Sequence, residues 1–190
     1  MAINLCAILL AAGQSKRFGG KQKQLALTPA QKPLINHSLT ALEQGFTGDI
    51  YTVLGCNHEK IKKVLASSSQ IMTHLDWQQG IGSSIKFAIQ QVSQSPISTK
   101  AAISGQAKND YSHILITLAD QVALTAQDFQ SLIQACKIHP TKIISSFYAN
   151  NCANVQLDSN LDDSLLNMGN YGVPAIFPAA FFPQLLKLSE

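Results

Sequence analysis

The sequence has no apolar segment long enough to cross a membrane as a helix. The apolar run near the N-terminus extends from Ile3 to Ala12, about half of the ~20 residues that a membrane-spanning helix needs. No basic segment precedes this run, as it would in a signal peptide. We therefore expect a soluble, cytoplasmic protein without a membrane partner, in which this run forms a buried strand.

The sequence also lacks a large excess of positive or negative charge, closely spaced cysteine pairs and histidines at metal-ligand spacing. The 14 Lys and Arg residues face 11 Asp and Glu residues, and this small excess argues against a nucleic-acid partner and favours a small anionic ligand. The four cysteines lie far apart without C-x-x-C spacing, which argues against a zinc site and a disulfide framework and indicates a reducing compartment. The five histidines show no metal-ligand spacing.

Neither of two familiar glycine-rich phosphate motifs follows the first apolar run. The residues fit neither G-x-G-x-x-G nor G-x-x-x-x-G-K-[ST]. The segment nevertheless combines an apolar strand, a turn of small residues around Gly13, and the cations Arg17, Lys21 and Lys23. Glycine can adopt backbone angles that a residue with a Cβ resists, and small side chains let backbone N–H groups approach phosphate oxygens closely. The segment therefore predicts a loop that binds a polyphosphate.

Strands and helices alternate along the chain, with short apolar runs for strands and apolar residues at helical spacing for helices. The expected strands are 4–10, 50–54, 70–73, 114–118 and 142–146, and the expected helices are 33–46, 57–65, 80–92 and 125–136. Thr125 and Asp128 resemble a capping box, and the polar segment 93–111 predicts a long, mobile surface loop. The alternation predicts an α/β fold with a largely parallel sheet, which binds its ligand at the carboxyl ends of the strands.

Four motifs, in order, resemble those of nucleotidyltransferases that activate a phosphorylated acceptor with a nucleoside triphosphate. They are L-A-A-G-Q-S-K-R-F-G with K-Q-L at 10–25, W-Q-Q-G-I-G-S-S at 77–84, L-A-D-Q at 118–121 and G-V-P-A-I-F at 172–177. The chain most resembles the molybdenum cofactor cytidylyltransferase group. This resemblance implies one domain with a three-layer, Rossmann-like nucleotidyltransferase fold and a mostly parallel sheet, and suggests a monomer.

The resemblance also implies a reaction and its residues. A terminal phosphate of the acceptor attacks the α-phosphorus of the nucleotide, and pyrophosphate leaves. Asp120 would bind Mg²⁺, Arg17 would neutralise the pyrophosphate, and Lys23 or Lys21 would contact the α-phosphate or the acceptor phosphate. The nucleotide-binding residues implied are Leu10, Ala11, Ala12, Gly13, Ser15, Arg17, Lys23, His74 and Ser84. The acceptor-binding residues implied are Gln121, Gly172 and Pro174.

The first loop also bears on the substrates. Guanylyltransferases of the wider family tend to have L-A-G-G where this chain has A-A-G, and the methyl group of Ala12 should disfavour a purine by narrowing the space near the base. CTP is therefore the expected nucleotide and molybdopterin the expected acceptor. Two alternatives remain open: a sugar- or polyol-phosphate cytidylyltransferase, such as the methylerythritol phosphate enzyme with its similar loop, and a nucleotide-binding module without catalysis.

The sequence departs from the family pattern at three places. His74 stands where the family has an asparagine that contacts the nucleotide, and Val122 replaces the proline after Asp-Gln. Family members also continue past a helix with G-x-P-x-x-F into a G-D-x-G-A loop and a D-I-D-T segment, which carries a second metal ligand. Neither motif occurs in these 190 residues. We therefore expect a domain without this C-terminal segment, for which nucleotide binding is better supported than catalysis.

Overall fold

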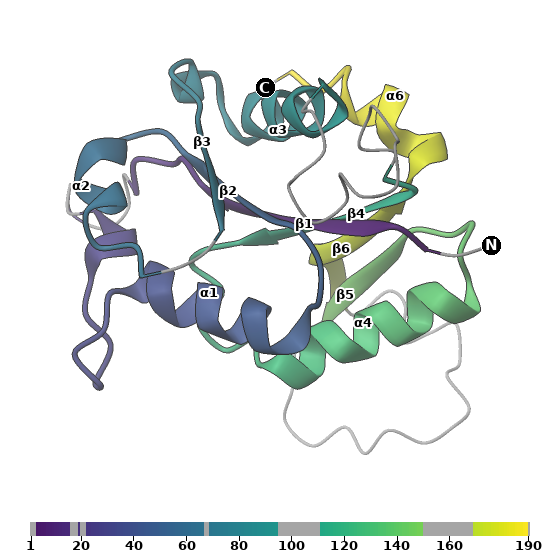
Figure 1. The fold of residues 1–190 in the computed structure, drawn as a ribbon, viewed down its shortest axis with the longest axis horizontal. Helices are drawn as coiled ribbons and strands as arrows, with labels where there is room; N and C mark the ends of the chain where they lie inside the picture. The colour runs from purple at the N-terminus through teal and green to yellow at the C-terminus, as the bar shows by residue number, and fades with distance from the viewer. Residues whose placement is uncertain are drawn as a thin grey trace, which may run out of the picture.

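A six-stranded sheet organises the chain (Figure 1). The structure is a computed structural model that describes residues 3–15, 19, 22–66, 69–94, 111–149 and 169–189. The strands lie in the order β3-β2-β1-β4-β6-β5. They are β1 Leu5–Ala11, β2 Ile50–Leu54, β3 Gln70–Thr73, β4 His113–Leu118, β5 Ile144–Ala149 and β6 Gly169–Pro178. β1 to β4 pair in parallel, whereas β6 runs antiparallel to both β4 and β5.

Helices cover both faces of this sheet. Figure 1 shows α1 (Leu34–Gly45) and α4 (Ala126–Ile138) on one face, and α3 (Ile81–Gln94) and α6 (Phe182–Leu185) on the other. Successive side chains of a strand point to opposite faces, so residues 7, 9 and 11 of β1 join the core under α1 and α4, and residues 6, 8 and 10 join the core under α3. The predicted three-layer α/β fold with a mostly parallel sheet is confirmed.

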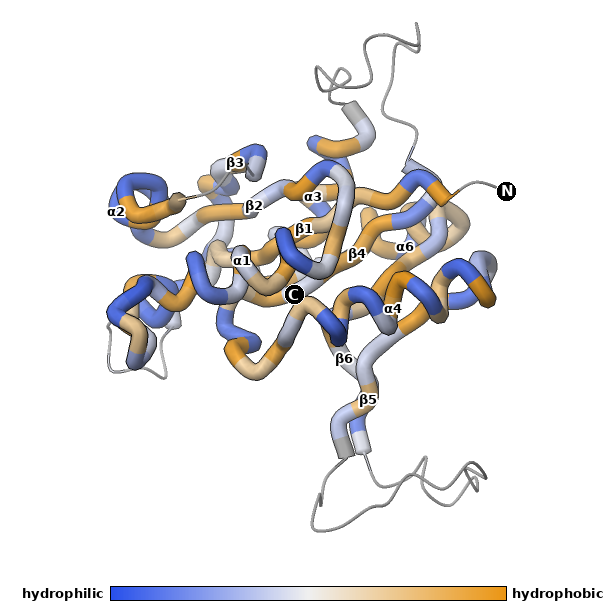
Figure 2. Tube along the Cα trace, turned by 60° about the horizontal axis from the view of Figure 1, so that its bottom comes forward, coloured by the Kyte–Doolittle hydropathy of each residue, from blue (hydrophilic) through white to orange (hydrophobic). Residues whose placement is uncertain are grey.

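The expected strand and helix starts agree closely with the structure, because their signals are local. β2 and β3 have the expected bounds, and all five residues of β2, four apolar ones and Thr52, are buried. At the start of α4, the backbone N–H of Thr125 donates to Asp128 Oδ2 at 2.8 Å and its hydroxyl donates to the same oxygen at 2.7 Å. In Figure 2, α4 alternates between hydrophobic and hydrophilic residues, as expected of a helix with one face on the core.

The expectation of a helix at G-x-P-x-x-F is wrong, since residues 172–177 lie within β6. β6 pairs Ala175 with Ser145 and Gly172 with Ser146, so Val173 and Pro174 form an irregularity between two paired positions. A bulge tolerates proline because the missing N–H is not needed in the ladder there. The glycine and proline therefore mark a bulge inside a strand and not a break between elements.

Two further boundaries differ from expectation. α2 is only five residues long, His58–Lys62, and Asn57 does not cap it with its side chain, because its amide donates instead to Gln22 Oε1 at 3.1 Å. Ser93 still belongs to α3, and Tyr111 is buried, so both ends of the expected surface loop were placed wrongly. Residues 95–110 of that loop lie outside the described residues. In the part of the chain that is described, every helix is too short or too polar to span a membrane.

Candidate active site

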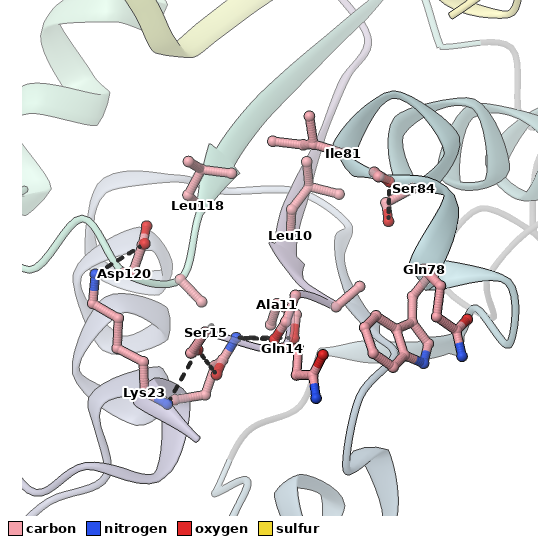
Figure 3. Close-up of a pocket in the computed structure, with 16 residues that line it drawn as sticks. Leu10, Ala11, Gln14, Ser15, Lys23, Gln78, Ile81, Ser84, Leu118 and Asp120 are labelled. Carbon is pink, nitrogen blue, oxygen red and sulfur yellow. Dashed lines mark hydrogen bonds and ion pairs between the residues drawn. The ribbon is translucent and has the colours of Figure 1, made fainter. Parts of the chain in front are cut away.

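A cleft of about 730 Å³ lies at the carboxyl ends of β1 and β4 (Figure 3). Four segments line it: the end of β1 with its following loop (10–15), a 3₁₀ turn (Lys23–Leu25), the start of α3 with the turn before it (77–84), and the end of β4 (118–120). Among the residues expected to bind nucleotide or metal, it contains Leu10, Ala11, Ala12, Gly13, Ser15, Lys23, Ser84 and Asp120. Arg17 and Lys21 lie outside the described residues.

Gln24 holds the loop after β1 in place. Its side chain is buried, and its Nε2 donates to the carbonyl oxygens of Ala11 and Gly13, each at 3.3 Å. Its Oε1 accepts from Ser15 Oγ at 3.2 Å and from Gln22 Nε2 at 2.8 Å. A buried amide with all these partners satisfied specifies one conformation of the loop. Gln24 is therefore a positioning residue. It belongs to the K-Q-L motif, but the sequence alone assigned no role to it.

The same loop presents backbone donors. Within the described residues, the N–H groups of Gly13, Gln14 and Ser15 have no hydrogen-bond acceptor, while the carbonyls of Ala12 and Gly13 are engaged by Cys56 N–H and by Gln24. Ser15 adopts a left-handed conformation with a φ of 58°. Successive free N–H groups around such a residue form an anion-binding concavity. The arrangement supports phosphate binding by the backbone.

Gly13 serves the loop in a different way from the one expected. Its φ is not positive, so backbone freedom is not its role here; the left-handed residue is Ser15. A Cβ built on Gly13 would meet no protein atom within 4 Å. Because Gly13 lines the cleft, the missing side chain leaves space for a ligand.

We expect Gly13→Ala to leave the melting temperature unchanged within error and to weaken binding of a nucleoside triphosphate by about 10-fold, because the new methyl group occupies ligand space without meeting protein. Isothermal titration with the metal–nucleotide complex checks the affinity, and thermal unfolding checks the fold. Gly48→Ala is a useful contrast, since its Cβ would come within 2.7 Å of the Phe46 ring, and it should destabilise the fold instead. Equal triphosphate affinities for wild type and Gly13→Ala would contradict this role.

Lys23 and Asp120 form an ion pair at one end of the cleft, although they lie 97 positions apart in the chain. Lys23 Nζ lies 3.1 Å from Asp120 Oδ2, and the two side chains are 38% and 43% exposed. The turn that carries Asp120 is fixed by its neighbour, because Ala119 N–H donates to Leu10 O at 3.0 Å and Ala119 O accepts from Ser38 Oγ at 2.8 Å. A half-exposed ion pair contributes little to stability. Its value lies in holding a cation and a carboxylate at the same end of the cleft.

The start of α3, with Ile81 and Ser84, and Gln78 before it form the opposite wall (Figure 3), and Trp77 also lines the cleft. Trp77 packs closely on Gly55, where a Cβ would come within 2.6 Å of Trp77 Cβ. Gly80 has a φ of 96°, a conformation that suits glycine, and its carbonyl accepts the buried hydroxyl of Ser84 at 3.4 Å. Gln78 and Ile81 also line this wall and were not assigned from the sequence.

His74 does not line this cleft. It is buried on the other side of the α3 start, where its ring stacks on Phe87 at 4.6 Å between centroids and its Nε2 lies 2.9 Å from Ser83 Oγ. Burial lowers the pKa of His74 and favours its neutral form. The structure therefore connects His74 to the cleft wall at the start of α3 through Ser83, the neighbour of Ser84.

Gln121, Gly172 and Pro174 lie beyond the Asp120 end and do not line the cleft. Gln121 Oε1 accepts from Leu118 N–H at 3.1 Å, and its Nε2 donates to Val173 O and to Tyr148 Oη. These bonds tie the end of β4 to β5 and β6. Of the three residues expected at the acceptor, Gln121 directly follows Asp120 and bonds to Val173, which lies between Gly172 and Pro174 in β6.

The donor set fits a divalent metal only as part of a metal–nucleotide complex. In the described ranges, no three His, Cys, Asp or Glu side chains gather to hold a metal, and Asp120 is the one carboxylate among the described residues that line the cleft. Mg²⁺ is commonly bound through one or two carboxylates while phosphates and water supply the other oxygens. A half-exposed Asp120 in the same cleft as the N–H groups of Gly13, Gln14 and Ser15 is consistent with that mode.

Comparison with known proteins agrees with this geometry. A model of the MobA-like NTP transferase domain matches residues 7–190. The bifunctional protein GlmU of Staphylococcus epidermidis is 27% identical over 128 residues, which is 67% of this chain and 25% of that protein. GlmU of Oceanobacillus iheyensis is 36% identical over 67 residues, which is 35% of this chain and 15% of that protein. The match therefore spans a quarter or less of these curated relatives.

Solved structures share the fold. Rv0371c from Mycobacterium tuberculosis H37Rv has a TM-score of 0.70 at 18% identity, covering 99% of this chain and 78% of its own. The bifunctional IspDF from Campylobacter jejuni has a TM-score of 0.66 at 18% identity, covering 98% and 44%. Since the family model matches almost the whole chain, the protein belongs to the MobA-like NTP transferase domain family.

Proposed function

We propose that this chain transfers CMP from CTP to a phosphorylated acceptor, molybdopterin, and releases pyrophosphate with the help of Mg²⁺. The observation that carries the proposal is the Lys23–Asp120 pair, held 3.1 Å apart at one end of a cleft. The loop of that cleft presents the N–H groups of Gly13, Gln14 and Ser15, which have no acceptor among the described residues. A cation, a carboxylate and backbone donors are the groups needed to bind and activate a metal–triphosphate.

The chain's own residues act by positioning and by stabilising charge. The N–H groups of Gly13, Gln14 and Ser15 bind phosphate oxygens, and Lys23 neutralises charge at the α-phosphate. An acceptor phosphate oxygen bonds to the α-phosphorus while the bond to the bridging oxygen breaks, and pyrophosphate leaves with that electron pair. Arg17 is proposed to neutralise the pyrophosphate.

Asp120 would hold the divalent metal, with phosphate oxygens supplying further ligands. The metal would act as a Lewis acid on the phosphates. Lys23 would then exchange Asp120 for a phosphate oxygen, since both partners of the pair are half exposed. One structural neighbour, Rv0371c, has a crystal structure as a complex with manganese, so Mn²⁺ belongs beside Mg²⁺ in any assay.

Ala12 supports CTP as the nucleotide. Ala12 is buried and lines the cleft, and its own carbonyl oxygen accepts a hydrogen bond from Cys56 N–H. We expect wild type to bind CTP more tightly than ATP or GTP, and Ala12→Gly to narrow that preference by about 10-fold by opening space for a purine. A calorimetric panel of four ribonucleoside triphosphates with Mg²⁺ measures this, with Ala30→Gly in an exposed turn as the matched control. Tighter binding of a purine triphosphate by wild type would overturn the CTP assignment.

A pyrophosphate-release assay tests the reaction. CTP, Mg²⁺ and molybdopterin together should release pyrophosphate, and omission of either the metal or the acceptor should stop the release. Release with a sugar or polyol phosphate in place of molybdopterin would establish the alternative cytidylyltransferase. Nucleotide binding without release under any of these conditions would make the chain a binding module.

A further inference from the structure

Tyr148, near the end of β5, has an exposed ring and a fixed hydroxyl group. The residue is 44% exposed, yet its hydroxyl donates to Val173 O at 2.6 Å and accepts from Gln121 Nε2 at 2.8 Å. Gln121 directly follows Asp120 in the chain. The ring is therefore immobilised beside the end of the cleft where we place the reacting phosphates.

The strand registers place Tyr148 at the level of Ala119, the residue before Asp120. Ala175 of β6 pairs with Ile116 of β4 on one side and with Ser145 of β5 on the other. β5 runs in the direction of β4, so Tyr148, three residues past Ser145, reaches the level of the turn after β4. Two strand spacings, about 10 Å, separate these two strands. Figure 2 shows the end of β5 and the start of β6 extending beyond the helices, away from the body of the molecule.

Gly172 leaves space next to the ring. A Cβ at Gly172 would lie 3.4 Å from Tyr148 Cε2 and 3.7 Å from Cδ2, so any larger side chain there would begin to cover the ring. An aromatic ring whose position is already fixed loses little conformational entropy when a flat ligand packs on it. The fixed hydroxyl and the adjacent glycine together produce an open, preorganised aromatic surface.

We infer that Tyr148 is the platform on which a planar heteroaromatic ring of the acceptor stacks while the acceptor phosphate reaches Asp120. The ligand class is a pterin carrying a phosphate on a short side chain. This inference rests on the proposed function and gives the acceptor its binding surface. Gln121 then acts as a positioning residue through the Tyr148 hydroxyl, and Gly172 acts by staying small, which explains how both serve the acceptor without lining the cleft.

The test measures binding of 6-hydroxymethylpterin phosphate through quenching of pterin fluorescence, in parallel with CTP affinity by calorimetry. Tyr148→Ala should weaken pterin binding by about 10- to 100-fold, the range for losing one aromatic stacking partner, and should leave CTP affinity unchanged. Tyr148→Phe keeps the ring and should retain most of the binding. Tyr171→Ala is the matched control, because Tyr171 is 61% exposed on the same two strands but packs with Phe147 on the opposite face.

Three different results would each overturn the inference. Equal losses in Tyr148→Ala and Tyr148→Phe would show that the hydroxyl anchor matters and the ring does not. Loss of CTP affinity together with pterin binding would assign Tyr148 a structural role. A wild-type protein that releases pyrophosphate with sugar phosphates but does not bind the pterin would reject the platform and leave nucleotidyl transfer standing.

Discussion

Replacing Asp120 with asparagine should lower metal-dependent pyrophosphate release by about 1,000-fold, the upper range for losing one preorganised charged group. Among the described residues that line the cleft, Asp120 is the one carboxylate, so no neighbour there can take over a metal. Asparagine has the same shape but no charge. Titration of Mg²⁺ against initial rates should show that raising the metal concentration does not restore the wild-type rate.

The fold should survive this change, which separates a role in catalysis from a structural one. The ion pair to Lys23 is half exposed, and its loss should cost at most about 1 kcal/mol in the free energy of unfolding. Glu59→Gln is the matched control, because Glu59 is an exposed carboxylate that pairs with Lys62 at 3.3 Å on α2, outside the residues that line the cleft. Near-normal turnover in Asp120→Asn would refute the proposed metal role.

Gln24→Met should have the second largest effect, on stability and on nucleotide affinity together. Methionine matches glutamine in length but offers no donor to the Ala11 and Gly13 carbonyls and no comparable acceptor to Ser15 and Gln22. Buried groups left unpaired cost about 1–3 kcal/mol each, and partial rearrangement of the loop should limit the total loss of unfolding free energy to about 2–4 kcal/mol. Urea denaturation measures that loss.

Triphosphate affinity should fall by about 10- to 100-fold in the same variant, because the backbone donors of the loop are no longer held in one arrangement. Gln127→Met on the exposed side of α4 controls for the substitution itself and should match wild type in both measurements. An unchanged affinity in a destabilised Gln24→Met protein would mean that the loop is ordered by other contacts.

Much of the fold could be predicted because its signals are local. β2 is a short, mostly apolar segment buried on both faces, and the Thr125–Asp128 pair marks the start of α4. β6 was not predicted, because its formation depends on strands that are distant in the sequence. It is an antiparallel strand whose partners, β4 and β5, supply its ladder across a bulge at Val173 and Pro174, and nothing in its own sequence indicates that pairing.

Some parts of the candidate site could likewise be predicted from the sequence, and others could not. The loop residues and Asp120 follow strands whose carboxyl ends meet at one edge, so their convergence follows from topology. The position of His74 behind Ser83 and that of Gln121 between Val173 and Tyr148 depend on side-chain contacts between distant segments. Position in a motif alone could not distinguish a residue that lines the cleft from one that supports its wall.

The register between β1 and β4 also sets the tolerance of this site to insertions. Leu10 pairs with Leu118. The loop after β1 begins two residues past Leu10, and Asp120 lies two residues past Leu118. A two-residue slip would keep every side chain on its proper face, so the cores could still form, but it would shift the loop against Asp120 by about 7 Å. Lys23 and Asp120 could not then meet at 3.1 Å. The pairing of β1 with β4 therefore fixes the distance between the two halves of the candidate site, and a folded variant with altered register should lose the proposed activity while keeping its packed cores.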